Sequence, residues 1–136
     1  MLALSLILVP LLIGGCASAA SNVDSVASQC YGDNSKPMYG YDENHALNSC
    51  DQAFIDDVSR QTGGHPEAGA NSVRAIGYSA LENDPSTAIK RFNQAWLLDR
   101  NDPETFRAFS AWETKMGNIE KADQFRDRAR RLQKLY

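Results

Sequence analysis

With 136 residues, of which 43% are hydrophobic and 23% charged, the chain has the size and composition of one small soluble domain with an additional segment. Its net charge of -3 lacks the basic excess of proteins that bind the phosphates of nucleic acids. Composition therefore indicates a single core and no nucleic-acid partner.

Residues 1–15 (MLALSLILVPLLIGG) contain no charged side chain and are mostly aliphatic, which is typical of the apolar region of a signal peptide. The apolar run before Gly14 is shorter than the roughly 20 residues that a membrane-spanning helix needs. Pro10 would also remove a hydrogen bond from the middle of such a helix. We therefore predict that residues 1–15 are a signal peptide for export.

The end of this segment and the cysteine after it resemble the lipobox of bacterial lipoproteins, in which an aliphatic and two small residues precede a cysteine. The four residues are Ile13, Gly14, Gly15 and Cys16. The resemblance implies that Cys16 becomes the first mature residue and that its thiolate takes up the lipid. By the same analogy, Ala17 favours the outer membrane, so we expect a lipid-anchored envelope protein that faces the periplasm. The alternative is a buried apolar helix with an incidental cysteine.

Residues 16–48 are expected to form a tether and an irregular segment, because residues 17–29 are rich in Ala, Ser and Asn and the rest shows no periodicity. Cys30 and Cys50 form an even pair, which in an exported protein is usually bonded. The bond would remove roughly 3 kcal/mol of unfolded-state entropy. Two free thiols are the alternative. A metal site is not expected, because the two cysteines and His45 supply too few ligands.

Residues 49–136 are expected to form a helical domain. Ser49 and Gln52 have the spacing of a capping box and predict a helix over 49–60, which Gly63 and Gly64 end. Four further helices follow, since apolar residues recur at helical spacing between clear start and stop signals. Those signals are Pro66, Asp84 with Pro85, Asp102 with Pro103, and the turn at Gly117 and Asn118.

Equivalent small and aliphatic residues recur at an offset of 34 residues. The pairs are Ala88 and Ala122, Ala95 and Ala129, and Leu98 and Leu132. Thirty-four residues is the tetratricopeptide period, and AIKRFNQAWLLDRNDPE (88–104) resembles the second helix of such a repeat running into the next one. RFNQAWLLD also resembles a group of small bacterial tetratricopeptide lipoproteins.

This resemblance implies an all-α fold: a short tetratricopeptide-like solenoid of about two antiparallel helix pairs, preceded by one N-terminal helix. In the family's pattern Ala88 and Ala95 are small sites where helices approach closely, and Phe92 fills the adjacent space. Gly77 and Tyr78 align with the family's glycine and aromatic residue. Arg126 replaces an aromatic residue, which suggests a terminal cap.

Two repeats are fewer than the roughly three that usually bury a continuous core. Either the helix at 49–61 packs on the first repeat, or a partner or second copy covers the open end. We expect the first, because Phe54, Ile55 and Val58 need a surface to pack against.

Tetratricopeptide units present a concave groove that takes a peptide, so the resemblance implies a membrane-anchored protein interaction module. The groove candidates by position are Asn71, Arg74, Tyr78, Arg107, Ser110 and Glu113. Arg74 and Arg107 are candidates to clamp a peptide carboxylate, the alternative being two solvated surface arginines. Trp96 and Trp112 are expected to pack between helices. We expect an accessory or scaffold subunit of an envelope complex; the alternative is a passive structural lipoprotein that self-associates.

Catalysis is not expected. Asp56, Asp57, His65 and Glu67 form the one cluster of acids and imidazole, but they lack a nucleophile with a base or the spacing of a metal triad. No cofactor is expected either.

Overall fold

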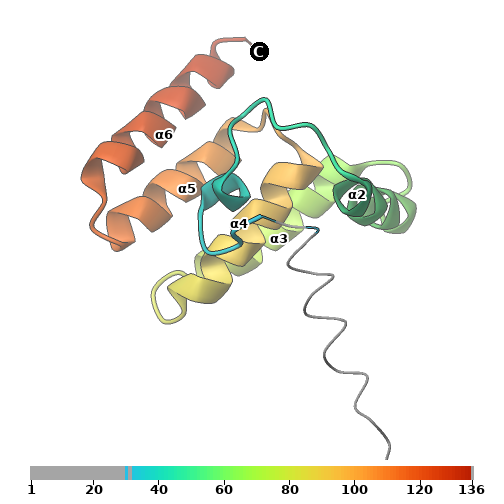
Figure 1. Cartoon of the computed structure of the whole chain (residues 1–136), viewed down its shortest axis with the longest axis horizontal. Coiled ribbons are helices and arrows are strands. Elements are labelled where there is room, and N and C mark those ends of the chain that lie inside the picture. The colour runs from blue at the N-terminus through green and yellow to red at the C-terminus, as the bar shows by residue number, and fades with distance from the viewer. Residues whose placement is uncertain (1–29, 31, 136) are drawn as a thin grey trace, which may run out of the picture.

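The computed structural model describes residue 30 and residues 32–135. Regular structure within that part is helical throughout and contains no β-strand, so the expected all-α fold is confirmed (Figure 1). The elements are the 3₁₀ turn η1 (Pro37–Gly40) and the helices α2 (Ser49–Gln61), α3 (Pro66–Ala80), α4 (Pro85–Leu98), α5 (Pro103–Lys115) and α6 (Ile119–Gln133).

Helices α4 and α5 begin at the predicted Asp-Pro pairs. The carboxylate of Asp84 accepts a hydrogen bond from the backbone N–H of Thr87 at 3.0 Å. The carboxylate of Asp102 accepts one from the N–H of Glu104 at 2.9 Å. The proline that follows each acid has no N–H to leave unpaired in the first turn, which is why these two starts are well defined by sequence.

The cap of α2 lies one residue earlier than predicted. Asn48, not Ser49, is the N-cap: its side chain accepts hydrogen bonds from the N–H groups of Cys50 and Asp51, both at 2.9 Å. Asp51, not Gln52, completes the capping box by accepting from the N–H of Asn48 at 3.1 Å. Asn48 has an extended backbone, which aims its side chain at the helix end, whereas Ser49 already lies within the helix.

Glycines end α2 and α5 as predicted. Gly63, Gly64 and Gly117 have φ values of 65°, 92° and 81°, a left-handed conformation that glycine adopts without a Cβ clash. The N–H of Gly64 bonds to the carbonyl of Ser59 in the six-residue pattern of a Schellman motif. A turn of the same type follows α5 at Gly117.

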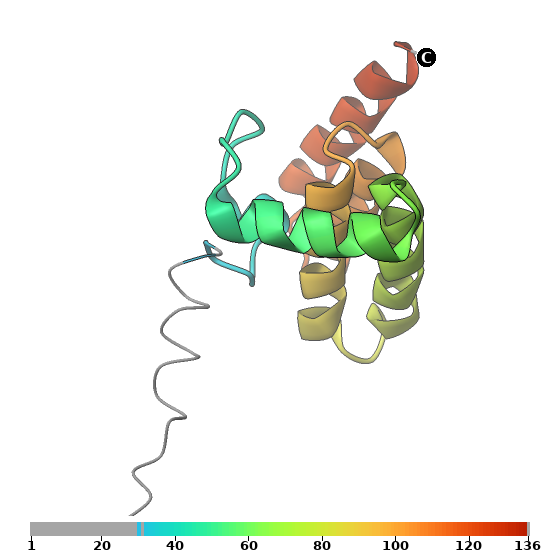
Figure 2. The same cartoon turned by 90° about the vertical axis from the view of Figure 1, so that its right-hand side faces the viewer.

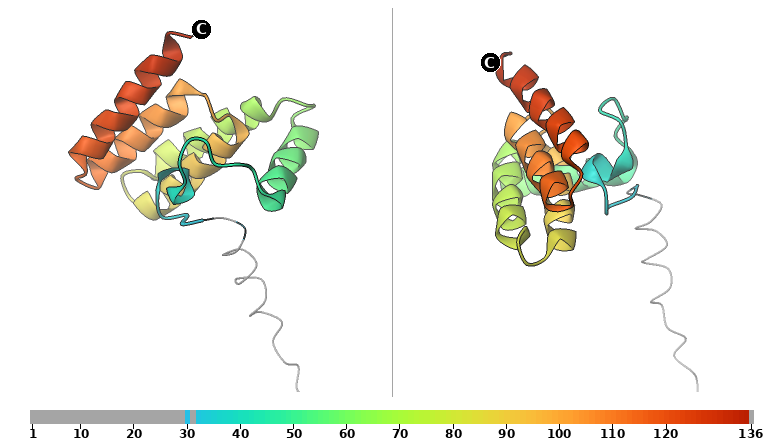
Figure 3. Two further views of the ribbon diagram at one scale, coloured as in Figure 1. Left: turned by 45° about the horizontal axis from the view of Figure 1, so that its top comes forward. Right: turned by 90° about the vertical axis from the view of Figure 1, so that its left-hand side faces the viewer.

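The helices pack as two antiparallel pairs, α3 with α4 and α5 with α6, and α5 packs on both helices of the first pair. Figure 3 shows the two pairs stacked in a short solenoid-like arrangement. The core runs between them and contains large side chains that are essentially inaccessible to water. These are Ile89, Phe92, Trp96, Phe106 and Phe109.

The residues that recur at an offset of 34 occupy equivalent buried positions in the two pairs. Ala88, Ala95 and Leu98 in α4, and Ala122, Ala129 and Leu132 in α6, are each at most 6% exposed. Equal burial at equal offset means that α4 and α6 play the same part in their helix pairs. The sequence repeat is therefore also a structural repeat.

Gly77 of α3 allows the first pair to pack closely. A Cβ atom at this position would lie 2.4 Å from the ring of Phe92 in α4, much too close for a normal contact. The neighbouring Tyr78 contacts the same ring edge-on, with ring centroids 5.2 Å apart. The absence of a side chain at position 77 therefore lets the Phe92 ring approach the α3 backbone closely.

Helix α2 covers the start of the solenoid, as expected. It crosses the α3–α4 pair (Figure 2). Phe54, Ile55 and Val58 of α2 pack against a buried cluster formed by Ala70 of α3 and by Ala95 and Leu98 of α4. This contact partly shields the apolar face of α2 from water and covers one end of the helix stack.

The irregular segment before α2 packs on the helical core through the buried Pro37 and Tyr39, so this part of it is not a free tether. Tyr39 is buried among the core side chains, and η1 packs on α4. The buried Asn93 of α4 donates hydrogen bonds to the carbonyl of Lys36 at 2.9 Å and to the side chain of Asn34 at 3.1 Å. The core therefore extends beyond the expected domain boundary at residue 49.

Two arginines hold the later part of this segment. Arg100 lies over the ring of Trp96 and donates hydrogen bonds to the carbonyls of His45 at 2.6 Å and Glu43 at 3.1 Å. Arg128 of α6 forms an ion pair with the carboxylate of Glu43 at 2.8 Å. Residues 43–45 are thereby tied both to the end of α4 and to α6.

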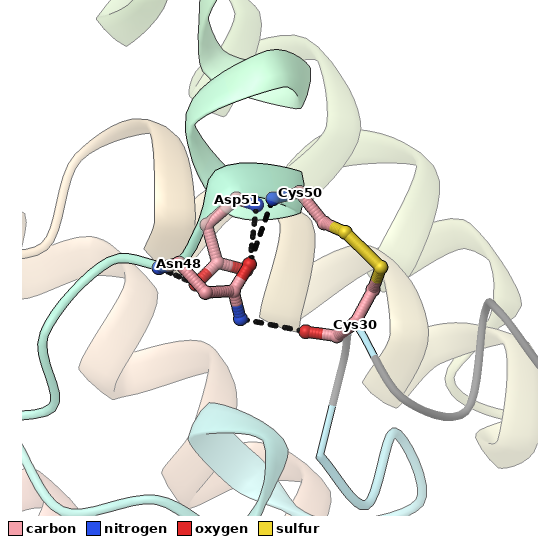
Figure 4. Close-up of a disulfide and its surroundings, with 4 residues drawn as sticks. All are labelled: Cys30, Asn48, Cys50 and Asp51. Atoms are coloured by element: carbon pink, nitrogen blue, oxygen red, sulfur yellow. Dashed lines mark hydrogen bonds between the residues drawn. A yellow bond between two sulfur atoms is a disulfide. The ribbon is translucent and has the colours of Figure 1, made fainter.

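A disulfide between Cys30 and Cys50 links the segment to the first turn of α2 (Figure 4). The two Cα atoms are 5.5 Å apart, and the bond closes a loop with a sequence separation of 20. The side-chain amide of the N-cap Asn48 donates to the carbonyl of Cys30 at 2.7 Å. The free-thiol alternative therefore does not describe this structure.

Cys16 and the expected signal peptide lie outside the described residues. Within the described part of the chain, no helix combines the length and the apolar character needed to cross a membrane.

Candidate functional site

The candidate site is a hollow of about 570 Å³ at the C-terminal end of α3, along α5 and against α6. Its lining residues are Leu81, Glu82, Arg107, Ser110, Ala111, Thr114, Lys115 and Arg126. Residues 107, 111 and 115 are spaced by four, so they lie on one stripe of α5. The opposite wall comes from the end of α3, and Arg126 reaches in from α6.

The hollow, here called the basic groove, is lined predominantly by basic side chains. Arg107, Lys115 and Arg126 line it together with a single acid, Glu82. Each of the three cations already has an acidic neighbour. The pairs are Arg107 with Glu104, Lys115 with Glu82 at 2.7 Å, and Arg126 with Asp123 at 2.7 Å. Such partly exposed pairs contribute about 0–1 kcal/mol each, so a ligand carboxylate can replace these acids at little cost.

Tyr78 of α3 is 43% exposed and lies near enough to Glu104 and Arg107 for their charges to act on its phenol. Partial burial raises the pKa of its phenol, and the negative charge of Glu104 raises it further. The hydroxyl is therefore protonated at neutral pH and available as a hydrogen-bond donor. Its ring is positioned by the edge-on contact with Phe92.

Arg74 does not act as a free clamp in this groove. It forms an ion pair with Asp102 at the start of α5 and also donates to the hydroxyl of Thr105 at 3.3 Å and to Asn71 at 2.6 Å. The side chains of Arg74 and Asp102 are only 12% and 14% exposed. These contacts occupy the guanidinium, so Arg74 joins α3 to the start of α5, with Asn71 of the same helix helping to hold it, and Arg74 is not free to bind a ligand.

Glu113 also lies away from the groove. It is buried on the opposite side of α5 and accepts a hydrogen bond from the side chain of Asn118 at 2.7 Å. Ser110 does line the groove but is largely buried. Of the six groove candidates, the structure places Arg107 and Ser110 in the lining.

Sequence reasoning missed Lys115 and Arg126. Lys115 could have been predicted, because it follows Arg107 and Ala111 at the helical spacing of four. Arg126 carries no such signal, because it belongs to another helix and enters the groove only through the packing of α6 on α5.

The other side chains that the sequence singled out make contacts within the protein. His65 contacts Glu67 at 3.0 Å on the exposed surface, while Asp56 accepts from Gln52 within α2. The indole N–H of Trp112 donates to the carbonyl of Pro85 at 2.8 Å. Within residues 30 and 32–135, no three His, Cys, Asp or Glu side chains gather as a metal site would require.

No family model, curated protein or solved structure matches this chain. The fold and the site define it as an all-α protein of stacked antiparallel helix pairs with a basic groove.

Proposed function

We propose that this chain is a tetratricopeptide-type interaction protein that binds a carboxylate-bearing segment of a partner protein in the basic groove. The observation that carries the proposal is the convergence of Arg107, Lys115 and Arg126 on one hollow of about 570 Å³. The repeat at 34 residues, with matching burial in α4 and α6, supports the family assignment.

Recognition in this groove would combine charge with limited apolar contact. Guanidinium groups offer paired donors that match the two oxygens of a carboxylate, and two arginines and a lysine face the same space. Leu81 and Ala111 supply an apolar floor for a side chain next to the carboxylate. The groove is open to solvent, which suits an extended peptide better than a small molecule enclosed on all sides.

The proposed location is the bacterial cell envelope, where a lipid on Cys16 would anchor the protein as an accessory or scaffold subunit. The lipobox resemblance of residues 13–16 supports this proposal. The disulfide also supports it, because such bonds persist in oxidising compartments outside the cytoplasm.

The groove is tested with the double variant Arg107→Ala and Arg126→Ala, compared with the matched variant Arg130→Ala and Arg131→Ala on the exposed part of α6. Tagged full-length chains are purified from envelopes, and their co-purifying proteins are quantified. We expect the groove variant to lose partner proteins and keep its helicity by circular dichroism, while the control retains both. Unchanged recovery with the groove variant would reject the proposal.

The anchor is tested separately by palmitate labelling and intact-mass measurement, with Cys16→Ser as the control. We expect a labelled chain that begins at Cys16 and an unlabelled variant. An unlabelled wild-type chain that retains residues 1–15 would remove the envelope proposal but leave the groove untouched.

The alternative, a structural lipoprotein that self-associates through an open end of the solenoid, has less support. Helix α2 already covers one end. At the other end, α6 carries the exposed ion pairs Arg126 with Asp123 and Arg130 with Asp127, which favour contact with water. Sedimentation of the full chain tests this alternative, since self-association would appear as a mass that rises with protein concentration.

A further inference from the structure

A second hollow, of about 500 Å³, lies on the side of α5 opposite the basic groove. One wall is the segment around η1, and the other is formed by α5 and α6. A smaller hollow of about 250 Å³ adjoins it and shares Ser35 and Trp112 with it. Together they form one surface depression, here called the Trp112 groove.

Apolar side chains, several of them aromatic, form one part of the lining of the Trp112 groove, here called its floor, and polar side chains such as Asn118 and Gln124 form the rest. Tyr41, Trp112 and Phe125 line the larger part, and Ile89 and Met116 line the smaller part. The indole N–H of Trp112 is already bonded to a backbone carbonyl, so this ring adds no unpaired donor to the floor. Met116 is 49% exposed, which leaves apolar surface in contact with water.

The η1 wall is held in an unusual backbone conformation. Met38 and Tyr39 have φ values of 53° and 55°, in the left-handed region that disfavours residues with a Cβ atom. Burial of Tyr39 in the core and the bond from the N–H of Asp33 to its carbonyl, at 2.8 Å, hold this turn in place. The turn places Pro37 and Tyr41 in the wall opposite α6, so the groove has a preformed side.

The rim of the Trp112 groove carries positive charge. Lys121 is exposed, and no ion pair in the described part of the chain involves it. Lys36, at the other side, pairs with Asp33 at 2.8 Å. The one acid in the lining, Glu113, is buried and bonded to Asn118. Lys121 therefore supplies the one lysine ammonium of the lining that no ion pair of the described residues neutralises, and it can attract a negatively charged ligand.

We propose that the Trp112 groove binds an acidic segment of a partner protein, with aromatic or proline side chains against Tyr41, Trp112 and Phe125 and a carboxylate at Lys121. This site is separate from the basic groove, because the two depressions use opposite faces of α5. A chain with both sites occupied would bridge two protein segments.

The test uses the full chain and three fluorescein-labelled peptides of equal length: repeats of Asp-Phe-Pro, of Lys-Phe-Pro and of Asp-Ser-Gly. Fluorescence anisotropy measures their binding. The peptides are compared on the Arg107→Ala and Arg126→Ala chain, which lacks the basic groove's own attraction for carboxylates. We expect only the Asp-Phe-Pro peptide to bind there, because it alone combines negative charge with apolar rings. Lys121→Glu and Met116→Asp should each weaken its binding about tenfold, since one reverses the rim charge and the other places charge on the floor.

Matched controls separate this site from the rest of the surface. Lys134→Glu makes the same lysine-to-glutamate change at an exposed position outside the Trp112 groove, and it should leave peptide binding unchanged. Binding of the Asp-Ser-Gly peptide by the wild-type chain, lost in the Arg107→Ala and Arg126→Ala chain, would report the basic groove, so that failure of one site is distinguishable from failure of the other.

Several results would overturn the proposal. They are absence of binding by all three peptides, equal binding of the lysine peptide, and binding that does not respond to Lys121→Glu and Met116→Asp. A concentration-dependent dimer that Met116→Asp abolishes would assign the Trp112 groove to a second copy of this chain instead.

Discussion

Arg74 of α3 and Asp102 at the start of α5 form an ion pair that is largely shielded from water, although 28 residues separate them in sequence. Asp102 also accepts hydrogen bonds from the N–H of Glu104 and from the hydroxyl of Thr105. A single carboxylate thus caps α5 and attaches it to the preceding helix pair. This ion pair explains why Arg74 joins α3 to the start of α5 and does not line the basic groove.

Arg74→Ala should destabilise the protein by roughly 3 kcal/mol, because it leaves the shielded carboxylate of Asp102 without its cation. Urea unfolding followed by circular dichroism measures the change. Arg126→Ala is the matched control and should cost less than about 1 kcal/mol, since its ion pair is exposed. Equal costs for the two variants would contradict the assigned role of Arg74.

Gly77→Ala should destabilise the protein by about 1–3 kcal/mol, because the added methyl group would overlap the Phe92 ring. Thermal unfolding provides the measurement, and Ser79→Ala on the exposed side of α3 provides the control. Combining Gly77→Ala with Phe92→Leu should recover part of the loss relative to the sum of the single variants. Strict additivity would argue against direct contact as the cause.

Reduction of the disulfide between Cys30 and Cys50 should lower the free energy of unfolding by roughly 3 kcal/mol, since the bond restricts a loop of about 20 residues in the unfolded chain. Urea unfolding with and without dithiothreitol tests this. A Cys30→Ser and Cys50→Ser variant should match the reduced protein and show no response to the reagent. A wild-type chain that is insensitive to reduction would contradict the expectation.

Stability should fall in acid partly through Asp33. Hydrogen bonds from Lys36 and then from Ser35 lower the pKa of its carboxyl from 3.8 to about 2. A folded-state pKa below the unfolded value means that the stabilisation is present above about pH 4 and is lost as the pH falls toward about 2. Thermal melts across this range should show a shallower decline in Asp33→Asn, and also in Lys36→Met, which removes the largest cause. A decline as steep as that of the wild type in both variants would contradict this contribution.

The sequence by itself determined the helices and their order. Asp84 and Asp102 with the prolines that follow them, and the glycines at 63, 64 and 117, act within a few residues, so a local pattern is sufficient. The repeat at 34 residues similarly predicted which small residues lie between helices. The cap at Asn48 shows the limit of such patterns, because Ser49 next to it is an equally suitable N-cap residue by type.

Tertiary structure alone decided which side chains meet. Arg74 pairs with Asp102, and Arg100 donates hydrogen bonds to the carbonyls of residues 43 and 45. Arg126 and Arg107 line one groove. All of these contacts exist only because particular helix faces pack together. The segment before α2 lacks periodicity, yet Tyr39 and Asn93 bring it into the core. Helix starts and stops depend on backbone groups a few residues apart, whereas these contacts depend on the packing of distant surfaces, which no local pattern encodes.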